Sequence, residues 1–156
     1  MITMTDKETS ITYHTLQPSQ TIGMIQRNEI AAFLHQHLDE YGDELEDISK
    51  CIDYALNTGV TPGGFIVTAR EGEELVGAVV MNKTGMDGYI PEYILVYIAI
   101  HNEHRGKGIG KQLMQHAIQQ ADGDIALHVE PNNPALHLYE KLGFTNKYLE
   151  MRLKNK

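Results

Sequence analysis

A glycine-rich stretch in the second half of the chain has the residue types of an anion-binding site. Residues 103–118 read EHRGKGIGKQLMQHAI and follow an apolar run, residues 93–100, that is typical of a buried strand. Glycines leave backbone N–H groups uncovered, and the first N–H groups of a helix have no partner within it. A strand, a glycine loop and a helix start in this order predict a phosphate site, to which Arg105, Lys107 and Lys111 add positive charge.

The spacing of the glycines excludes two common phosphate-binding motifs. A Walker loop requires a glycine at Arg105 and a serine or threonine where Gln112 follows Lys111. A dinucleotide fingerprint requires its third glycine at Lys111 or Leu113. A nucleotide phosphotransferase is therefore disfavoured, and the pattern that fits residues 105–110 is R-x-x-G-x-G.

A second motif follows downstream, since residues 133–144 read NPALHLYEKLGF. With R-x-x-G-x-G before it and one strand between, the chain resembles the GNAT superfamily of acyl-CoA-dependent N-acyltransferases. The resemblance is clear over residues 62–153, and the order of elements extends it to the N-terminus. It implies acetyl-CoA as cosubstrate, bound through its pyrophosphate at the glycine loop.

The hydrophobic periodicity predicts a single domain, residues 1–156, with the element order β-α-α-β-β-β-α-β-α-β. Strands are expected at residues 11–16, 64–70, 75–81, 92–100, 124–129 and 148–153, and helices around 30–41, 45–56, 109–121 and 134–142. Residues 92–100 are apolar on both parities, which predicts burial on both faces. With the resemblance, this indicates an α/β (α+β) class: a mixed, mostly antiparallel central sheet of about six strands flanked by helices.

Acyl transfer to an amine requires a proton acceptor, a donor for the developing oxyanion and an acid for the leaving thiolate. The resemblance assigns the acid to Tyr139, whose alternative role is packing on the buried side of its helix. The base is Glu92 or His128; the alternatives are a solvated carboxylate at a strand start and a core histidine. The residues that the resemblance assigns to the cofactor are Ile98, Ala99, Ile100, Arg105, Gly106, Lys107, Gly108, Ile109, Gly110, Lys111, Asn132 and Asn133.

Two of these assignments are specific to the backbone or to a helix cap. The backbone N–H groups of Ile98 and Ile100 are expected to face the pantetheine arm and the thioester oxygen, whereas their side chains belong to the core. Asn133 is expected to cap its helix and contact the cofactor, with Asn132 as an alternative.

The charge balance bears on the partners. A net charge of −8 argues against nucleic acid or an anionic membrane as the main partner. Residues 39–47 hold six carboxylates and no basic residue, which indicates either attraction for a cationic acceptor or a solvated helix boundary.

The single cysteine, Cys51, forms no internal disulfide and fits a reducing compartment, with a packing role expected. No apolar stretch approaches about 20 residues and no signal peptide is recognised, so a cytoplasmic location is expected. No H-E-x-x-H or cysteine–histidine motif occurs, so no metal is expected.

The leading hypothesis is an N-acetyltransferase that transfers acetyl from acetyl-CoA to a primary amine by direct attack in a ternary complex. The alternative is a non-catalytic acyl-CoA-binding regulatory module. The resemblance also implies a possible homodimer, because many members of the family dimerise.

Overall fold

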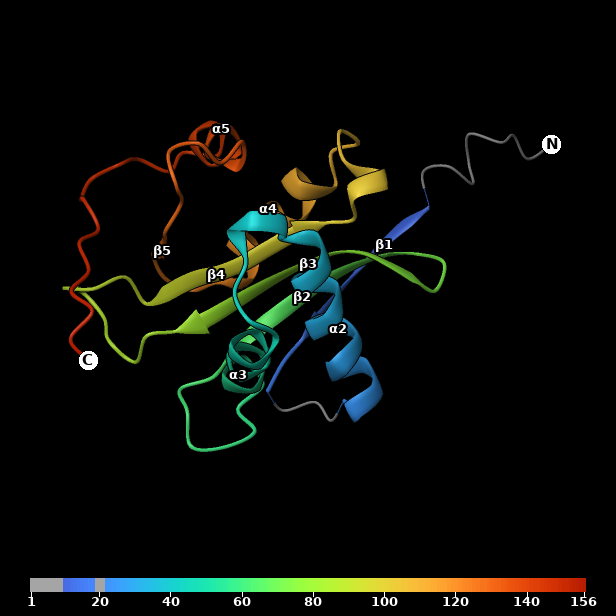
Figure 1. Ribbon diagram of the computed structural model, residues 1–156, viewed down its shortest axis with the longest axis horizontal. Coiled ribbons are helices and arrows are strands. Elements are labelled where there is room, and N and C mark those ends of the chain that lie inside the picture. The colour runs from blue at the N-terminus through green and yellow to red at the C-terminus, as the bar shows by residue number, and fades with distance from the viewer. Residues whose placement is uncertain (1–9, 19–21) are drawn as a thin grey trace.

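The computed structural model describes residues 10–18 and 22–156, which form a mixed sheet with helices on both faces (Figure 1). The five strands lie in the order β1-β2-β3-β4-β5. The element bounds are β1 Ile11–Leu16, α2 Met24–His37, η1 Asp39–Tyr41, α3 Leu45–Ala55, β2 Gly64–Glu71, β3 Glu74–Lys83, β4 Tyr93–Ile100, η2 Asn102–His104, α4 Ile109–Gln120, β5 Ile125–Leu127 and α5 Ala135–Lys141. The predicted fold class is confirmed.

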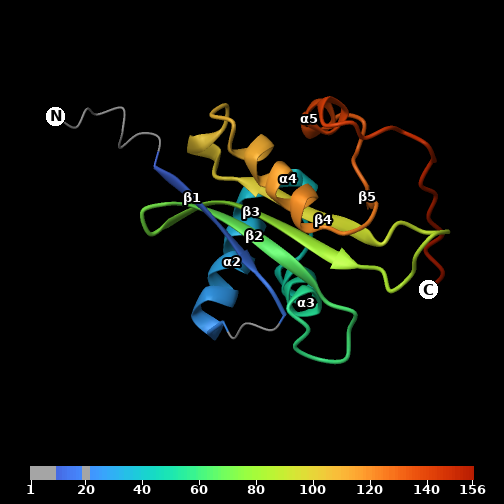
Figure 2. The same cartoon turned by 180° about the vertical axis from the view of Figure 1, so that it is seen from behind.

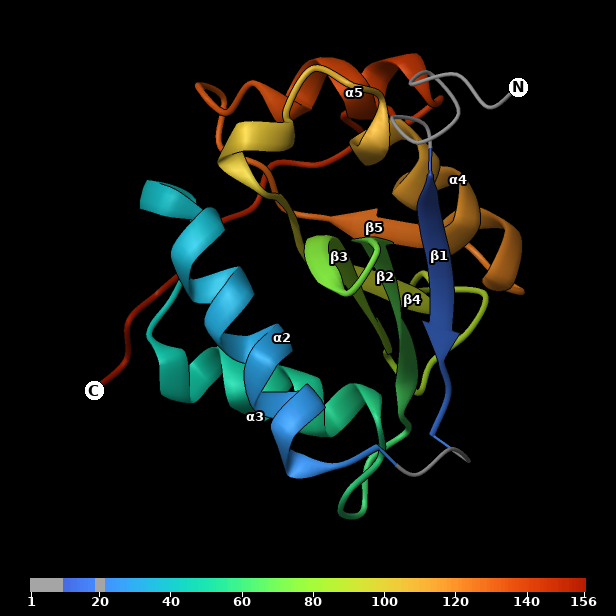
Figure 3. The same cartoon turned by 90° about the vertical axis from the view of Figure 1, so that its right-hand side faces the viewer.

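Each face of the sheet is covered by its own pair of helices. Helices α2 and α3 lie together on one face, and α4 and α5 lie on the other (Figures 2 and 3). Two hydrophobic clusters fill the layers: one contains Ile30, Ile48 and Ile52 from α2 and α3, and the other contains Leu113 and Met114 from α4. The sheet is therefore buried on both sides, as the apolar run of β4 predicts.

A bulge in β4 changes which side chains meet which helices. The register passes from Val80↔Tyr97 to Met81↔Leu95, so Val96 is the extra residue. Leu95 belongs to the cluster under α4, whereas Tyr97, two residues later, belongs to the cluster under α2 and α3. The bulge interrupts the alternation of side chains along the strand, and the Tyr97 hydroxyl reaches Asp43 in the loop between α2 and α3.

The sheet opens on the far side of β4. Strands β1 to β4 are antiparallel, whereas β5 is parallel to β4 and pairs only with Tyr93–Leu95. Strand β5 is shorter than the predicted 124–129. Within the described residues, the second half of β4 therefore has a sheet neighbour on one side only.

The predicted sixth strand, residues 148–153, is absent from the described structure, and this prediction was wrong. The segment forms no ladder, and Leu149, Met151 and Leu153 are 85%, 89% and 86% exposed. Alternating apolar residues favour an extended chain, but a strand also needs a neighbouring strand to pair with. Arg152, which lies 3.3 Å from a ring nitrogen of His128, gives this segment a contact near β5.

None of the described helices is both long enough and apolar enough to cross a bilayer.

Candidate active site

The glycine loop joins the end of β4 to the start of α4 through the short helix η2. Gly106 and Gly108 have φ angles of +80° and +83°, in the left-handed region that favours glycine. A Cβ added at either position would meet no atom within 4 Å, so the loop needs these glycines for its backbone conformation and not for lack of space. The loop is also left open to a ligand.

The first turn of α4 presents backbone donors to this loop. The Gln112 N–H donates to the Gly108 carbonyl at 3.1 Å, so the N–H groups of residues 109–111 precede the first hydrogen bond of the helix. Lys107 and Lys111 are exposed beside them and form no ion pair among the described residues. Free amides, a helix N-terminus and two basic side chains form a donor set that suits a phosphate.

Arg105 is held by groups outside the loop. Its guanidinium donates to the Ile100 carbonyl at 3.2 Å and to the His37 carbonyl at 2.8 Å. It also contacts Asp39 Oδ2 at 3.3 Å. These acceptors lie at the C-terminal ends of β4 and α2, where the helix carries partial negative charge. The contacts favour a positioning role for Arg105, since they fix the entry of the loop against α2.

The backbone N–H groups along β4 point alternately toward β3 and away from it. The N–H of His101 donates to Val76 on β3 at 2.8 Å. Successive residues of an antiparallel strand point their N–H groups to opposite sides, so those of Ile98 and Ile100 point away from β3. They face the side on which β5 has already ended, where the predicted acyl-CoA contacts require them.

Tyr139 lies on α5 and is buried, with 6% of its surface exposed. Its ring packs 5.9 Å from that of Phe144, and burial raises the pKa of its hydroxyl to about 12. The hydroxyl has no hydrogen-bond partner among the described residues and stays protonated at neutral pH. Leu138 of the same helix lies 3.4 Å from the position of a Cβ on Gly110, so α5 packs on the first turn of α4.

The two asparagines before α5 have different contacts. Asn133 Oδ1 accepts a hydrogen bond from the Ala135 N–H at 2.9 Å at the start of α5, where Pro134 occupies the N-cap position. The backbone carbonyl of Asn132 accepts from the Tyr41 hydroxyl at 3.2 Å. This bond joins η1 to the loop between β5 and α5 across the site.

The two predicted bases have contrasting surroundings. Glu92 accepts hydrogen bonds from the N–H groups of Asp124 at 2.7 Å and Gly88 at 3.0 Å, and these bonds lower the pKa of its carboxyl group. It also lies six residues, or about 20 Å of strand, before Ile98. His128 is exposed after the end of β5. The structure does not bring these two side chains together.

A hydroxyl–carboxylate pair between buried Tyr97 and exposed Asp43 was not predicted as a unit. The Tyr97 hydroxyl donates to Asp43 in the loop between α2 and α3, and burial together with this carboxylate raises the pKa of the tyrosine. Nearby, Cys51 Sγ lies 3.3 Å from Asn82 Nδ2, and burial raises the pKa of the thiol to about 12. The apolar strand and the acidic segment were both noticed in the sequence, but the bulge that joins them has no local signal.

Comparisons with known proteins agree with this geometry. The profile described as "Acetyltransferase (GNAT) family" matches residues 23–144. Human "Cysteine-rich protein 2-binding protein" is 40% identical over 105 residues, which are 66% of this chain and 12% of that protein. "Streptothricin acetyltransferase" of Escherichia coli is 38% identical over 117 residues, 70% of this chain and 65% of the relative. The chain thus spans a small part of the human protein and just under two thirds of the bacterial one.

A solved structure supports the fold over a longer stretch. A possible acetyltransferase from Clostridium difficile 630 has a TM-score of 0.67 at 18% identity, covering 94% of this chain and 97% of that chain. This likeness shows that the two chains share a fold. The chain belongs to the acetyltransferase (GNAT) family, and acyl transfer is the activity that this membership supports.

Proposed function

We propose that this protein is an N-acetyltransferase that moves the acetyl group of acetyl-CoA to a primary amine by direct attack in a ternary complex. The observation that carries the proposal is that backbone N–H donors follow one another along β4, the glycine loop and the first turn of α4. The outward N–H groups of Ile98 and Ile100 lead through the glycine loop to the open amides of α4. A long cosubstrate with a phosphate part and a thioester part fits such a track.

The chain's own groups divide the work along this track. The amides of residues 106–111 bind the pyrophosphate, with Lys107 and Lys111 contributing charge. Backbone N–H groups on β4 stabilise negative charge on the carbonyl oxygen, a contribution of about 2.7–4 kcal/mol for one such donor in other enzymes. Acetyl-CoA supplies the activated acetyl group as a thioester.

Tyr139 is proposed as the acid that protonates the departing thiolate. Its pKa of about 12 keeps the proton in place at neutral pH, and its hydroxyl has no competing partner among the described residues. A protein nucleophile is not required for direct attack, and the raised pKa of Cys51 makes its thiol a poor one.

His128 is the better of the two proposed bases. Two backbone bonds make the Glu92 carboxylate a weaker base, whereas His128 is exposed after the end of β5 and accepts no backbone hydrogen bond from the described residues that would lower its basicity. Replacement of His128 by glutamine is expected to remove the acidic limb of the pH–rate profile, and Glu92→Gln to retain it. If both profiles match that of the wild type, neither residue is the base.

The acceptor is proposed to be a cationic amine. The acidic segment 39–47 lies beside the site, because Tyr97 of β4 bonds to Asp43 and Tyr41 bonds to the loop before α5. Asp43, Glu44 and Glu46 are exposed, so their charge is available to a second ammonium group. The similarity to an enzyme named for acetylating streptothricin shows that a relative takes a small-molecule acceptor.

Calorimetric titration tests the cosubstrate first. Acetyl-CoA should bind, whereas ATP and NAD should not, and turnover with an amine panel should then follow. Binding without turnover on any amine would favour the non-catalytic acyl-CoA-binding module. Absence of acetyl-CoA binding by folded protein would refute the proposal.

The acceptor class has its own test. The combined change Asp43→Asn, Glu44→Gln and Glu46→Gln should raise the KM of a diamine several-fold and leave the KM of a monoamine of equal length unchanged. Such a difference would show that the acidic side chains bind the second ammonium group of the diamine, which does not take part in acetyl transfer. Equal KM values before and after the change would return this segment to the role of a solvated helix boundary.

A further inference from the structure

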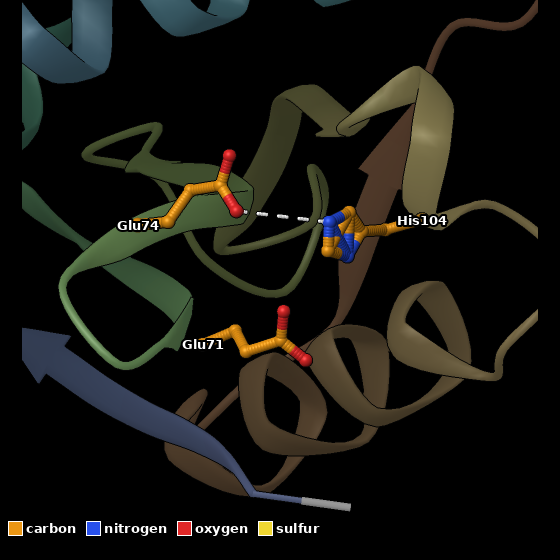
Figure 4. A group of neighbouring side chains, drawn as sticks. All are labelled: Glu71, Glu74 and His104. Carbon is orange, nitrogen blue, oxygen red and sulfur yellow. Dashed lines mark ion pairs between the residues drawn. The ribbon is translucent and has the colours of Figure 1, made fainter. Parts of the chain in front are cut away.

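Three potential metal ligands meet outside the acyltransferase site, at one end of the sheet. Glu71 ends β2 and Glu74 begins β3, and the two lie opposite one another in the hairpin register. His104 ends η2, thirty residues later in the chain. One donor atom from each residue lies within 4.8 Å of the others, and the three side chains point toward a common space (Figure 4).

The imidazole of His104 packs edge-to-face against the ring of His101, with the centroids 5.2 Å apart, and forms no hydrogen bond among the described residues. Its Nε2 lies 3.8 Å from Glu74 Oε1, which is too long for a hydrogen bond. The side chain is only 12% exposed, and its Nδ1 is buried without a hydrogen-bond partner among the described residues. Nε2 is the ring nitrogen that lies toward Glu74, so it is the donor atom that a cation held by the two glutamates would meet, whereas the unpartnered Nδ1 is the other nitrogen of the ring.

The neighbouring histidines have other roles. The Nδ1 of His101 accepts from the Glu103 N–H at 3.1 Å, so the proton of the neutral ring lies on Nε2. That nitrogen lies 3.9 Å from Glu74 Oε2, which is also too long for a hydrogen bond. The Nδ1 of His37 accepts from the Asn102 N–H at 3.3 Å, and its ring packs 4.3 Å from that of His101. His104 is thus the available imidazole of this group.

The two glutamates lack a fixed cation. Within the described part of the chain, neither Glu71 nor Glu74 forms an ion pair with a lysine or arginine. Arg70, the adjacent basic residue, is bound instead by Glu29 at 2.7 Å and by the Glu73 carbonyl at 2.9 Å. Among the described residues, the two carboxylates therefore have only imidazoles, those of His101 and His104, as nearby groups that can carry positive charge.

We propose that Glu71, Glu74 and His104 form a site for a divalent transition-metal ion of the Zn²⁺ and Co²⁺ type. Imidazole and carboxylate are ligands that these ions accept, and water completes the coordination. Metal–ligand distances near 2.1 Å place tetrahedral donor atoms about 3.4 Å apart. The donor atoms now lie within 4.8 Å of one another, so the side chains must move closer together when the ion binds. Glu74 is 56% exposed, which leaves room for this movement and gives the ion an entry path.

The position gives the ion a structural consequence. His104 directly precedes Arg105, so a metal bound here ties the β2–β3 hairpin to the entry of the glycine loop. The absence of a metal motif in the sequence does not bear on this site, because its ligands come from three elements and not from one local spacing. The proposal is independent of the acceptor and of acetyl transfer.

Metal-free full-length protein titrated with Co²⁺, followed by visible absorption and by Zn²⁺ competition, tests the site. We expect one equivalent of Co²⁺ with d–d bands typical of oxygen and nitrogen ligands. Glu74→Gln and His104→Gln should each weaken binding at least about tenfold, and the matched change His137→Gln, at a side chain 80% exposed on α5, should leave it unchanged. Circular dichroism of each variant checks that it is folded.

Two outcomes would overturn the proposal. One is failure of the metal-free wild type to bind Co²⁺ or Zn²⁺. The other is equal affinity in the wild type and in both folded variants, Glu74→Gln and His104→Gln. A thermal midpoint that rises with Zn²⁺ in the wild type, and not in Glu74→Gln, would give support without reference to activity.

Discussion

Replacing Tyr139 by phenylalanine removes one hydroxyl from a ring that otherwise stays packed. The ring is 6% exposed and lies 5.9 Å from that of Phe144, and the hydroxyl has no hydrogen-bond partner among the described residues. No buried group therefore loses a partner, and the free energy of unfolding near pH 7 should change by less than about 1 kcal/mol. Loss of a general acid instead costs about 10²–10⁴-fold in rate, or roughly 2.7–5.5 kcal/mol of activation free energy.

The assay compares kcat for an accepted amine with the calorimetric Kd of acetyl-CoA. The expected result is a kcat lower by about 10²-fold or more with an unchanged Kd and an unchanged thermal midpoint. Full turnover by Tyr139→Phe would refute the role of the hydroxyl as acid. A parallel loss of acetyl-CoA binding would show that the side chain positions the cosubstrate instead.

The same substitution isolates a pH effect on stability. Burial raises the pKa of Tyr139 from 10.0 to about 12, so the folded state holds the phenolic proton more tightly than the unfolded state. The resulting stability is complete below pH 10 and is lost as the pH rises toward 12. Between pH 9 and pH 11 this group should cost the wild type about 1 kcal/mol that Tyr139→Phe does not lose. Equal losses in urea unfolding at the two pH values would refute the effect of burial.

Three further changes test other parts of the structure. Gly108→Ala places an alanine at a φ angle of +83°, at a cost of about 1–3 kcal/mol, and should weaken acetyl-CoA binding in calorimetry. The control Gly59→Ala, at a position with open space and no left-handed φ, should leave binding unchanged. Arg105→Lys loses the guanidinium contacts to α2 and β4 and should destabilise by about 1–3 kcal/mol in urea unfolding; an unchanged midpoint would contradict this. Because the pKa of Cys51 is about 12, its thiol should react with a disulfide reagent at pH 8 about 10³-fold more slowly in folded than in unfolded protein; rapid labelling of folded protein would contradict its burial.

The motifs predicted the family because each depends on a local physical requirement. Gly106 and Gly108 adopt left-handed backbone angles, and the Asn133 side chain accepts a backbone N–H at the start of the helix that carries Tyr139. Both requirements act within a few residues of the chain, so the sequence reports them directly. The same is true of the order of elements, because apolar periodicity records which face of each helix or strand is buried.

Local patterns were less informative wherever a distant partner decides the outcome. Residues 148–153 alternate as a strand does, but they form no ladder in the described structure. Arg105 has the charge of a phosphate ligand, yet it is held by the ends of α2 and β4. Glu92 has a carboxylate that could act as a general base, yet two backbone amides stabilise its charged form and lower its pKa.

The sequence by itself determined the family, the glycine loop and the order of elements, because these depend on backbone angles, helix caps and hydrophobic periods that neighbouring residues set. Tertiary structure alone decided the bulge at Val96, which turns Tyr97 toward Asp43, and the end of β5 after three paired residues, which opens one side of β4. It also decided the meeting of Glu71 and Glu74 with His104. Each of these depends on the register between strands and on how η2 lies against a hairpin, and such long-range pairing is recorded at no single place in the chain.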